Sequence, residues 1–341
     1  MSSEERDMAK RTIIVTGGNA GLGLAFGREL GRDADILVVI ACRDLLRGEQ
    51  AATTLRGQGV HAHVLPLDLA DLASVRRFPD ALREAALPPL AGLICNAGVQ
   101  DGGTPRRTVD GFDETFGVNH LGHYLLARLL LPVMARGASI VFVASNTHDA
   151  STGTGLPEPT YPGAAALAAD QATGSKAGQK RYTESKLCII YTAYELARRL
   201  EASPEAHLRS IRVNAFDPGM VPGTGLARRY PAPLRFIWSY ILPVLTLFQR
   251  NVNRPATSAR RMAALVNGGM GDLNGKYVSM GQVTASSALS YDRENAADLW
   301  EASAAMIDLP PTLGDAGEAV AHRPANSIVA APPQARPAEG A

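Results

Sequence analysis

Hydrophobic and polar positions alternate in blocks along this chain. Short runs rich in Val, Ile and Leu, which we interpret as buried strands, cover residues 12–16, 36–41, 63–67, 92–95, 139–144, 209–216 and 275–280. Between them lie longer stretches with helical periodicity, at 22–31, 45–57, 71–86, 112–136, 182–202 and 254–267. Strands that alternate with helices predict a parallel sheet, and strands without polar positions predict helices on both faces. The pattern therefore predicts an α/β fold, a single doubly wound Rossmann-type parallel sheet of about seven strands.

This alternation runs unbroken from about residue 10 to residue 308, so we expect one domain over 10–308. Residues 1–9 carry charges of both signs, which predicts a flexible N-terminus and not a secretory signal. Residues 309–341 are rich in Ala and Pro without periodicity, which predicts a disordered tail.

A small substrate lobe is expected at about 220–250, and it contains the apolar run 236–248. A membrane-spanning helix needs about 20 apolar residues, so this run is too short to span a bilayer. Three interpretations stay open for it: a lid over an apolar substrate, a contact with a membrane surface or second subunit, and an ordinary covering helix. Peripheral membrane contact, a monomer and a homo-oligomer are all compatible with the sequence.

Composition narrows the classes of function. Hydrophobic residues make up 46% of the 341 residues, charged residues make up 20%, and the formal net charge is +1. This balance gives no electrostatic footprint for nucleic acid, so we expect a small-molecule partner. Three widely spaced cysteines, Cys42, Cys95 and Cys188, predict free thiols in a reducing cytoplasm, with neither disulfides nor a metal site.

The first predicted strand runs directly into the glycine-rich segment TGGNAGLG, residues 16–23. Gly17, Gly21 and Gly23 would permit a tight turn, a close backbone approach to phosphates and close packing of the next helix. The helix N-terminus would offer free N–H groups to a pyrophosphate. This context, between a strand and a helix, predicts dinucleotide binding. The alternative is a glycine-rich turn that binds nothing.

The second predicted strand ends in ACRD, where NAD-binding proteins of this fold carry an acid for the ribose hydroxyls. Cys42 occupies that position and Arg43 follows it. A guanidinium suits a 2′-phosphate, so NADP(H) is favoured over NAD(H). The alternative is that Arg43 is merely solvated. Asp44 is expected to cap the next helix in either case.

A third segment, RYTESK at 181–186, places Tyr182 and Lys186 four residues apart at the start of a helical pattern. Residues at this spacing share one helix face, so the phenol and the ammonium would lie side by side. Such a pair is common by chance, and its meaning depends on the rest of the chain.

Seven segments occur in one order: TGGNAGLG, LDL at 67–69, CNAG at 95–98, VNHLGHYLL at 118–126, VAS at 143–145, YTESK, and DPG at 217–219. On these residues the chain resembles the short-chain dehydrogenases/reductases over roughly 10–306. The resemblance implies a catalytic tetrad of Asn119, Ser145, Tyr182 and Lys186. The predicted cofactor contacts are Arg43 and the residues that the resemblance implies: Gly17, Asn19, Gly21, Leu22, Gly23, Asp68, Leu69, Asn96, Ala97, Gly98, Tyr182, Lys186, Pro218, Gly219 and Thr224.

Within that set, the resemblance places Asp68 at the adenine, and Asn96 to Gly98 beside the cofactor where they steady the sheet. Thr224 would reach the amide or phosphate of the cofactor, although its position is shifted by one residue from the family pattern.

The implied chemistry suits these residue types. A carbonyl that accepts hydride develops negative charge and needs a proton, which Tyr182 can supply. A free phenol has a pKa of about 10, and Lys186 with the positive charge of an oxidised nicotinamide would lower it. Ser145 would hydrogen-bond the substrate oxygen, and the resemblance implies that Asn119 holds a water that relays protons to Lys186. The alternatives are that Ser145 caps a turn and Asn119 satisfies backbone groups.

Several other polar residues are expected to be structural. His120 and His123 are interpreted as packing or hydrogen-bonding residues, because no ligand partners stand at metal-binding spacing. His148 is a weaker candidate for the mouth of the substrate site. Glu184 and Asp149 are expected to be solvated.

Within the family, the resemblance is strongest to retinol dehydrogenases and light-dependent protochlorophyllide reductases. The interval from Ser145 to Tyr182, 37 residues, is long, and its content at 146–180 is loop-like and expected to form one wall of the site. The protochlorophyllide branch carries a functional cysteine after the Pro-Gly pair, where Met220 stands here.

The sequence thus predicts an NADP(H)-dependent oxidoreductase acting on a carbonyl or alcohol of a hydrophobic small molecule, such as a retinoid, terpenoid, lipid or aromatic polyketide. One alternative is a light-dependent C=C reductase of the protochlorophyllide type. Another is a non-catalytic nucleotide-binding sensor or scaffold, against which the retained Tyr182 and Lys186 count.

Overall fold

A computed structural model describes residues 9–221 and 253–313. The predicted substrate lobe, the apolar run 236–248, Thr224 and most of the tail therefore lie outside the described residues. No helix in the two described ranges is long and apolar enough to cross a membrane.

Eight strands form one sheet, in the order β3-β2-β1-β4-β5-β6-β7-β8. The first seven are parallel and β8 pairs antiparallel with β7, so the predicted doubly wound parallel sheet is confirmed. The order reverses between β1 and β4, and ligands of such sheets bind at this switch point, outside the carboxyl ends of the strands. The strands are β1 (Arg11–Thr16), β2 (Ile36–Cys42), β3 (His61–Pro66), β4 (Leu90–Cys95), β5 (Met134–Val143), β6 (Arg212–Asp217), β7 (Lys276–Ser279) and β8 (Gln282–Thr284).

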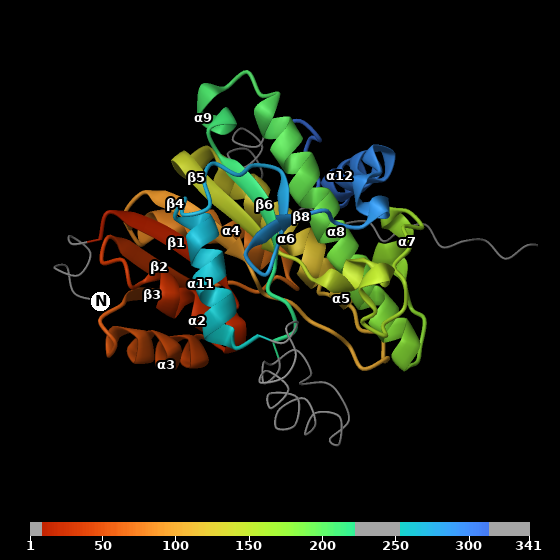
Figure 1. Cartoon of the computed structure of the whole chain (residues 1–341), viewed down its shortest axis with the longest axis horizontal. Coiled ribbons are helices and arrows are strands. Elements are labelled where there is room, and N and C mark those ends of the chain that lie inside the picture. The colour runs from red at the N-terminus through yellow and green to blue at the C-terminus, as the bar shows by residue number, and fades with distance from the viewer. Residues whose placement is uncertain (1–8, 222–252, 314–341) are drawn as a thin grey trace, which may run out of the picture.

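Helices cover both faces of the sheet (Figure 1). One face carries α2 (Gly21–Leu30), α3 (Leu45–Arg56) and α11 (Pro255–Val266) over one apolar cluster. The other carries α4 (Leu72–Glu84), α6 (Gly122–Leu130), α8 (Ser175–Glu201) and α12 (Arg293–Met306) over a second. All seven residues of β2 are buried, because a strand covered on both sides has no solvent face. Short helices α5 (Glu114–Phe116), α7 (Ala164–Ala169) and α9 (Ala206–Arg209) are the other α-helices of the described residues.

The predicted helix 112–136 is divided into several pieces. After α5 the chain forms a π-helical turn at Gly117–Leu121, then α6, and then a 3₁₀ turn at Leu131–Val133. The last residues of the prediction were wrong, since β5 begins at Met134. Pro132 lacks the N–H needed to continue an α-helix. Gly137, with φ +73°, accommodates the register shift at the start of β5.

The insertion 146–180 is only partly loop. It contains α7 and the first residues of α8, which starts at Ser175 and not at 182. The segments AAALAA and SKAGQK are rich in helix formers, which explains both helices. A side chain at Gly178 would clash with the carboxylate of Asp101, so this glycine lets α8 pass close to the loop after β4.

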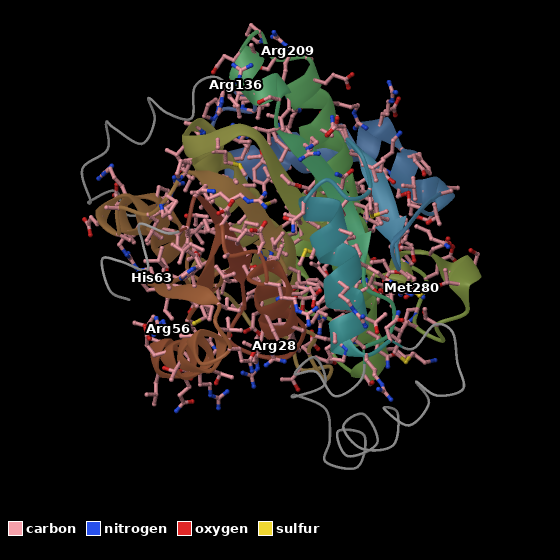
Figure 2. The ribbon with its side chains drawn as sticks, turned by 60° about the vertical axis from the view of Figure 1, so that its left-hand side comes forward. Arg28, Arg56, His63, Arg136, Arg209 and Met280 are labelled. Carbon is pink, nitrogen blue, oxygen red and sulfur yellow. The ribbon has the colours of Figure 1, made fainter. Side chains whose placement is uncertain are left out.

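The C-terminal part contains two elements that the hydrophobic pattern did not reveal, β8 and α12. Met280 and Gly281 have φ of +49° and +83°, and Ser279 pairs with Gln282 across this two-residue turn. Met280 is labelled in Figure 2. Two central residues with positive φ define the tight hairpin turn that suits twisted strands. β8 has only three residues and all are exposed, which is too short for a period to be seen.

The chain remains attached to the domain beyond residue 308. The Arg128 guanidinium donates to the carbonyls of Pro310 and Thr312 (2.8 and 2.6 Å), and Trp300 Nε1 donates to that of Pro311 (2.7 Å). Arg199 Nη1 also donates to the Pro311 carbonyl at 3.2 Å, so the first residues of the expected tail are held on the domain through their backbone. The domain limits themselves stay a prediction.

Candidate active site

The glycine-rich turn leads from β1 into α2. Gly17 and Gly21 have φ of +63° and +54°, a backbone conformation that L side chains rarely adopt. A Cβ on Gly23 would press against the carbonyl of Gly17 and lie 2.6 Å from Asn96 Nδ2. All three glycines are thus required by the geometry. Asn19 and Leu22 lie half-buried in the turn and in the first turn of α2.

Thr16, the last residue of β1, ties this turn to the end of β4. Its Oγ accepts hydrogen bonds from the backbone N–H groups of Asn96 and Ala97, both at 2.9 Å. Asn96 Nδ2 donates to the Thr16 carbonyl at 2.8 Å. Gly98 follows, close to the Asn119 side chain. The predicted cofactor residues at 16–23 and 96–98 therefore meet at the switch point of the sheet.

Arg43 extends from the end of β2 with its side chain 68% exposed, and its Nη1 lies 3.8 Å from Asp68 Oδ2. Asp68 also accepts from Ala70 N at 3.0 Å, and the neighbouring Leu69 is buried. Asp44 Oδ1 accepts from the Arg47 N–H at 3.1 Å, so the predicted helix cap is confirmed. A cationic guanidinium thus lies at the carboxyl end of β2, and among the described residues it forms one exposed ion pair.

Tyr182 and Lys186 share one face of α8, with Lys186 Nζ 5.6 Å from the centre of the Tyr182 ring. Nζ donates to the carbonyl of Val143, the last residue of β5, at 2.8 Å. Burial lowers the pKa of Lys186 to about 8, against the opposing charge of Asp217. The bond to Val143 holds the lysine at the carboxyl end of the central strand, two residues before Ser145.

Ser145 is half-buried and caps the 3₁₀ turn Asn146–His148, with its Oγ accepting from Thr147 N at 3.3 Å. The turn packs against α8, which brings Ser145 to the helix that carries Tyr182. The alternative interpretation, in which Ser145 caps a turn, is therefore correct as far as this hydrogen bond is concerned. A hydroxyl that accepts this weak bond keeps its proton for another acceptor.

Asn119 lies in the π-helical turn, a distortion that is frequent at functional sites. Its Oδ1 accepts from Val99 N at 2.8 Å, while Nδ2 donates to Val99 O and Ser185 Oγ at 3.0 and 2.9 Å. The side chain therefore satisfies backbone groups, as the alternative interpretation held, and joins the loop after β4 to α8 next to Lys186. A water held by Asn119 stays a prediction.

The predicted structural roles of His120 and His123 are confirmed. His120 bonds Thr192 and Ser303 through its two ring nitrogens. His123 Nδ1 lies 3.0 Å from the Asn119 carbonyl and Nε2 lies 2.9 Å from Thr16 Oγ. Since a carbonyl only accepts, Nδ1 carries the proton. Burial lowers the pKa of His120 to about 3 and that of His123 to about 4, so both rings are neutral.

Glu184 was predicted to be solvated, which is wrong: its side chain is only 5% exposed. Its Oε1 accepts from Thr160 Oγ at 2.8 Å and lies 3.7 Å from Lys180 Nζ. Burial raises the pKa of this carboxyl. Thr160 belongs to the insertion 146–180, so Glu184 fastens that insertion to the catalytic helix.

Sequence analysis also missed Arg181, the residue before Tyr182. Its buried guanidinium donates to both carboxylate oxygens of Asp101, at 2.9 and 3.1 Å. Its Nε also lies 3.6 Å from Asp113, and Nη1 lies 3.5 Å from Asp170. Burial raises the pKa of Asp113 to about 6. No local signal in the sequence marks this cluster, because its partners come from two separate connections: Asp101 and Asp113 lie between β4 and α5, and Asp170 lies between α7 and α8.

The other predicted cofactor residues follow β6. The Pro218 carbonyl accepts from Asn253 Nδ2 and Ser258 Oγ, at 3.1 and 2.8 Å. Gly219 has φ +74° and donates to Asp217 Oδ1 at 2.9 Å. These bonds fix the turn after β6 against α11. Thr224 lies outside the described residues.

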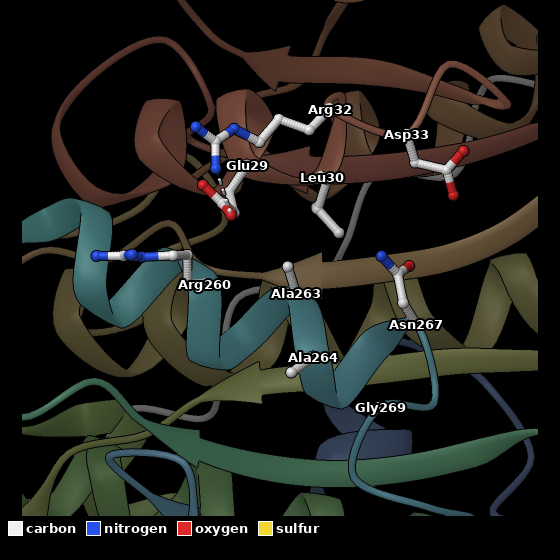
Figure 3. A pocket seen from close by; sticks show the side chains of 9 residues that line it. All are labelled: Glu29, Leu30, Arg32, Asp33, Arg260, Ala263, Ala264, Asn267 and Gly269. Carbon is white, nitrogen blue, oxygen red and sulfur yellow. Dashed lines mark hydrogen bonds and ion pairs between the residues drawn. The ribbon is translucent and has the colours of Figure 1, made fainter.

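A hollow of about 420 Å³ lies elsewhere, between the C-terminal ends of α2 and α11 (Figure 3). It is lined by Glu29, Leu30, Arg32, Asp33, Arg260, Ala263, Ala264, Asn267 and Gly269. Two of these lining residues, Glu29 and Arg32, form an ion pair at 3.2 Å. The glycine turn lies at the opposite end of α2, about 13 Å away along a ten-residue helix, so this hollow is separate from the candidate active site.

Known proteins that are similar to this chain belong to the family that its sequence motifs resemble. A family model described as short chain dehydrogenase matches residues 11–155. Protochlorophyllide reductase A, chloroplastic, of Hordeum vulgare is 32% identical over 330 residues, which cover 90% of this chain and 83% of the relative. The protochlorophyllide reductase of Avena sativa is also 32% identical, over 87% of this chain and 99% of the relative.

Among solved structures, an uncharacterized protein from Mycobacterium Paratuberculosis has a TM-score of 0.64 and 29% identity, covering 89% of this chain and 95% of its own. The angucycline C-6 ketoreductase LanV with bound NADP has a TM-score of 0.59 and 22% identity, covering 81% and 96%. LanV shares the fold.

Proposed function

Because the chain belongs to the short-chain dehydrogenase/reductase family, and within it is related to the protochlorophyllide reductases, we propose that it is an NADP(H)-dependent oxidoreductase acting on a carbonyl or alcohol group of a hydrophobic small molecule. One observation carries this proposal. Tyr182 and Lys186 lie together on α8, with Lys186 buried and bonded to the end of β5 two residues before Ser145. A proton donor, a cation beside it and a hydroxyl at the strand end are what carbonyl reduction requires.

The residues at the switch point fit a dinucleotide. Glycines 17, 21 and 23 bring the start of α2 close to the end of β1, where the N–H groups of the helix N-terminus would face the pyrophosphate of a bound dinucleotide. The exposed Arg43 at the end of β2 suits a 2′-phosphate, which favours NADP(H) over NAD(H). When bound, NADP(H) supplies or accepts the hydride.

The protein's own groups manage the proton. Tyr182 donates a proton to the substrate oxygen as negative charge develops there. Below pH 8 Lys186 is an ammonium, and this charge makes ionisation of the neighbouring phenol easier. Ser145 donates a hydrogen bond to the same oxygen and orients it toward Tyr182. Asn119 fixes the loop after β4 to Ser185 and so sets the spacing of the site.

Light-dependent reduction of a C=C bond is a second candidate, favoured by the similarity to protochlorophyllide reductases, among them those of Hordeum vulgare and Avena sativa. Met220 argues against it. A thioether carries no proton, whereas the corresponding position in the photochemical branch resembled by this chain holds a cysteine. We therefore prefer reduction in the dark.

The test measures NADPH consumption against hydrophobic aldehydes, ketones, quinones and protochlorophyllide, in darkness and in light. Dark turnover of a carbonyl substrate supports the proposal, and turnover of protochlorophyllide only in light selects the second candidate. Tyr182→Phe should lower dark turnover roughly 10²-fold, the scale of lost general acid catalysis, with NADPH binding nearly unchanged. Silence under all conditions, with NADPH bound, would instead leave a nucleotide-binding sensor or scaffold.

A further inference from the structure

His148 is a buried histidine, 2% exposed, that the proposed chemistry does not use. Its Nδ1 lies 2.6 Å from the carbonyl oxygen of Ser145, and its Nε2 accepts from the Ser287 N–H at 3.1 Å. A carbonyl only accepts and an amide N–H only donates, so the ring is neutral with the proton on Nδ1. Both nitrogens are committed, and the ring packs edge-on against Tyr277 at 5.0 Å. The sequence-based prediction that His148 lies at the entrance of the substrate site is therefore wrong.

Ser287 belongs to a short segment that is itself fastened to α8. Tyr194 of α8 bonds Ser286 Oγ at 2.8 Å, and Tyr191 donates to the Leu289 carbonyl at 2.8 Å. The Tyr194 ring also stacks on Tyr291, with centroids 5.5 Å apart. Residues 286–291 thus follow α8, the helix that carries Tyr182 and Lys186.

His148 closes a connection between two catalytic elements. From Ser145 the connection runs through the imidazole to Ser287, and from residues 286–291 to α8. It links positions 139 residues apart in sequence. Ser145 Oγ makes one hydrogen bond with a described residue, which it accepts from Thr147 N, and this bond is long at 3.3 Å. The backbone of Ser145 is therefore held more firmly than its hydroxyl.

We propose that His148 is a positioning residue, which sets the Ser145 hydroxyl relative to Tyr182 by bracing the turn after β5 against residues 286–291. The inference rests on the proposed function, because it assigns Ser145 the task of orienting the substrate oxygen. His148 is not one of the four residues of the predicted catalytic tetrad. His148 acts through Ser145 and does not touch substrate.

Three substitutions separate the two hydrogen bonds of the ring. Asn at 148 keeps a donor near the Nδ1 position, Gln keeps an acceptor near Nε2, and Phe keeps only the packing on Tyr277. With a carbonyl substrate from the dark panel, His148→Phe and His148→Gln should lower kcat roughly ten- to hundredfold, since small misplacements of reacting groups cost this much. His148→Asn keeps the bond to Ser145 but loses the bond to Ser287, so it breaks the connection at its other end and should lower kcat to a similar extent. The NADPH Kd should stay constant throughout.

A double-mutant cycle supplies a readout that a purely structural role would not move. In a Ser145→Ala background, His148→Phe should lower kcat by less than about twofold, because residues acting as a unit are not additive. Full additivity, or a parent-like kcat in both His148→Phe and His148→Gln, would overturn the inference. If His148→Phe does not fold, the Gln and Asn pair alone decides. Should Tyr182→Phe also retain parent activity, the proposed function fails, whereas a Tyr182→Phe loss with unaffected His148 variants rejects only the positioning role.

Discussion

The predicted cofactor site at the end of β2 has an exposed arginine, whereas the catalytic helix α8 has a buried one. At the end of β2, Arg43 is 68% exposed and lies 3.8 Å from a partly exposed Asp68. At the start of the catalytic turn, Arg181 is 2% exposed and bonded bidentately to Asp101, which is 5% exposed. Both regions use an arginine beside an aspartate, yet the two pairs do different work.

An exposed pair contributes little to stability, about 0–1 kcal/mol, because water and salt screen it. Arg43 can therefore exchange Asp68 for a phosphate at little cost. A buried charge has no such freedom, since losing one partner leaves the other unpaired in a low-dielectric interior. Arg181 thus fixes the position of Tyr182, the next residue, relative to the loops that bear Asp101, Asp113 and Asp170. We infer that the exposed pair at the end of β2 (the exposed edge) selects the ligand, and that Arg181 with its three aspartates fixes the position of the catalytic residues.

The largest effect should come from Arg181→Met, which keeps volume and removes charge. Three acidic side chains would lose their cation, and breaking a buried pair in this way costs about 3–5 kcal/mol of unfolding free energy. Urea unfolding of the full chain measures it. Arg83→Met is the matched control, since Arg83 pairs with Asp80 on the surface, with side chains 76% and 54% exposed. Equal losses in the two variants would contradict the division between buried and exposed charge.

A second effect concerns the protonation of Lys186. Burial depresses its pKa to about 8, so Nζ is charged below that pH and neutral above it. Because the ammonium assists Tyr182, kcat/KM should fall about tenfold per pH unit above pH 8 in the free enzyme. Lys186→Arg should remove this limb from the pH profile, whatever its absolute activity, because a guanidinium stays charged. An unchanged limb in that variant would assign it to another group.

Local patterns accounted for the parts of the site whose residues are near one another in sequence. The glycine turn, the Asp44 cap and the Tyr182–Lys186 pair all involve residues within a turn or two, where strand and helix periods apply. The parallel sheet followed from the apolar strands in the same way. The roles of the catalytic tetrad came from resemblance and stay predictions.

The rest depended on distant partners. Asp101 and Arg181 are 80 residues apart, and His148 and Ser287 are 139 apart. The residues next to Glu184 in sequence do not indicate that Thr160 donates a hydrogen bond to its carboxylate. The three-residue β8 and the early start of α8 were missed for a related reason: tertiary contacts, here to β7 and to Asp101, decide short elements and helix ends.

A third effect tests the exposed edge directly. If Arg43 meets the 2′-phosphate, the parent should bind NADPH at least about tenfold tighter than NADH, since a charge-assisted hydrogen bond contributes about 1.5–3 kcal/mol. Arg43→Ala should erase most of this preference without changing the free energy of unfolding. Arg47→Ala is the control, because Arg47 is also exposed but pairs with Asp44 in the first turn of α3. Fluorescence titration with both cofactors measures the ratio, and a parent without preference would reject the assignment.

The smallest effect comes from Asp44, the residue next to Arg43. Its Oδ1 caps α3 by accepting from Arg47 N at 3.1 Å, and Oδ2 lies 3.4 Å from Arg47 Nε. Asp44→Ala should cost about 1 kcal/mol of unfolding free energy, the usual cost of a lost N-cap. Asp44→Ser retains a capping oxygen without charge, so it should lose only a few tenths of a kcal/mol.

These two Asp44 variants decide whether folding and ligand selection are separable at the exposed edge. The cap acts on α3 and Arg43 acts on the cofactor, so the NADPH-to-NADH ratio should stay within about twofold of the parent in both variants, as expected for independent sites. A stability loss in Asp44→Ser equal to that in Asp44→Ala would mean that the charge and not the cap stabilises α3. A collapse of the cofactor ratio in Asp44→Ala, together with its retention in Asp44→Ser, would mean that the cap also holds Arg43 in place. In that case even an exposed arginine would depend on a structural bond, and the contrast with Arg181 would become one of degree.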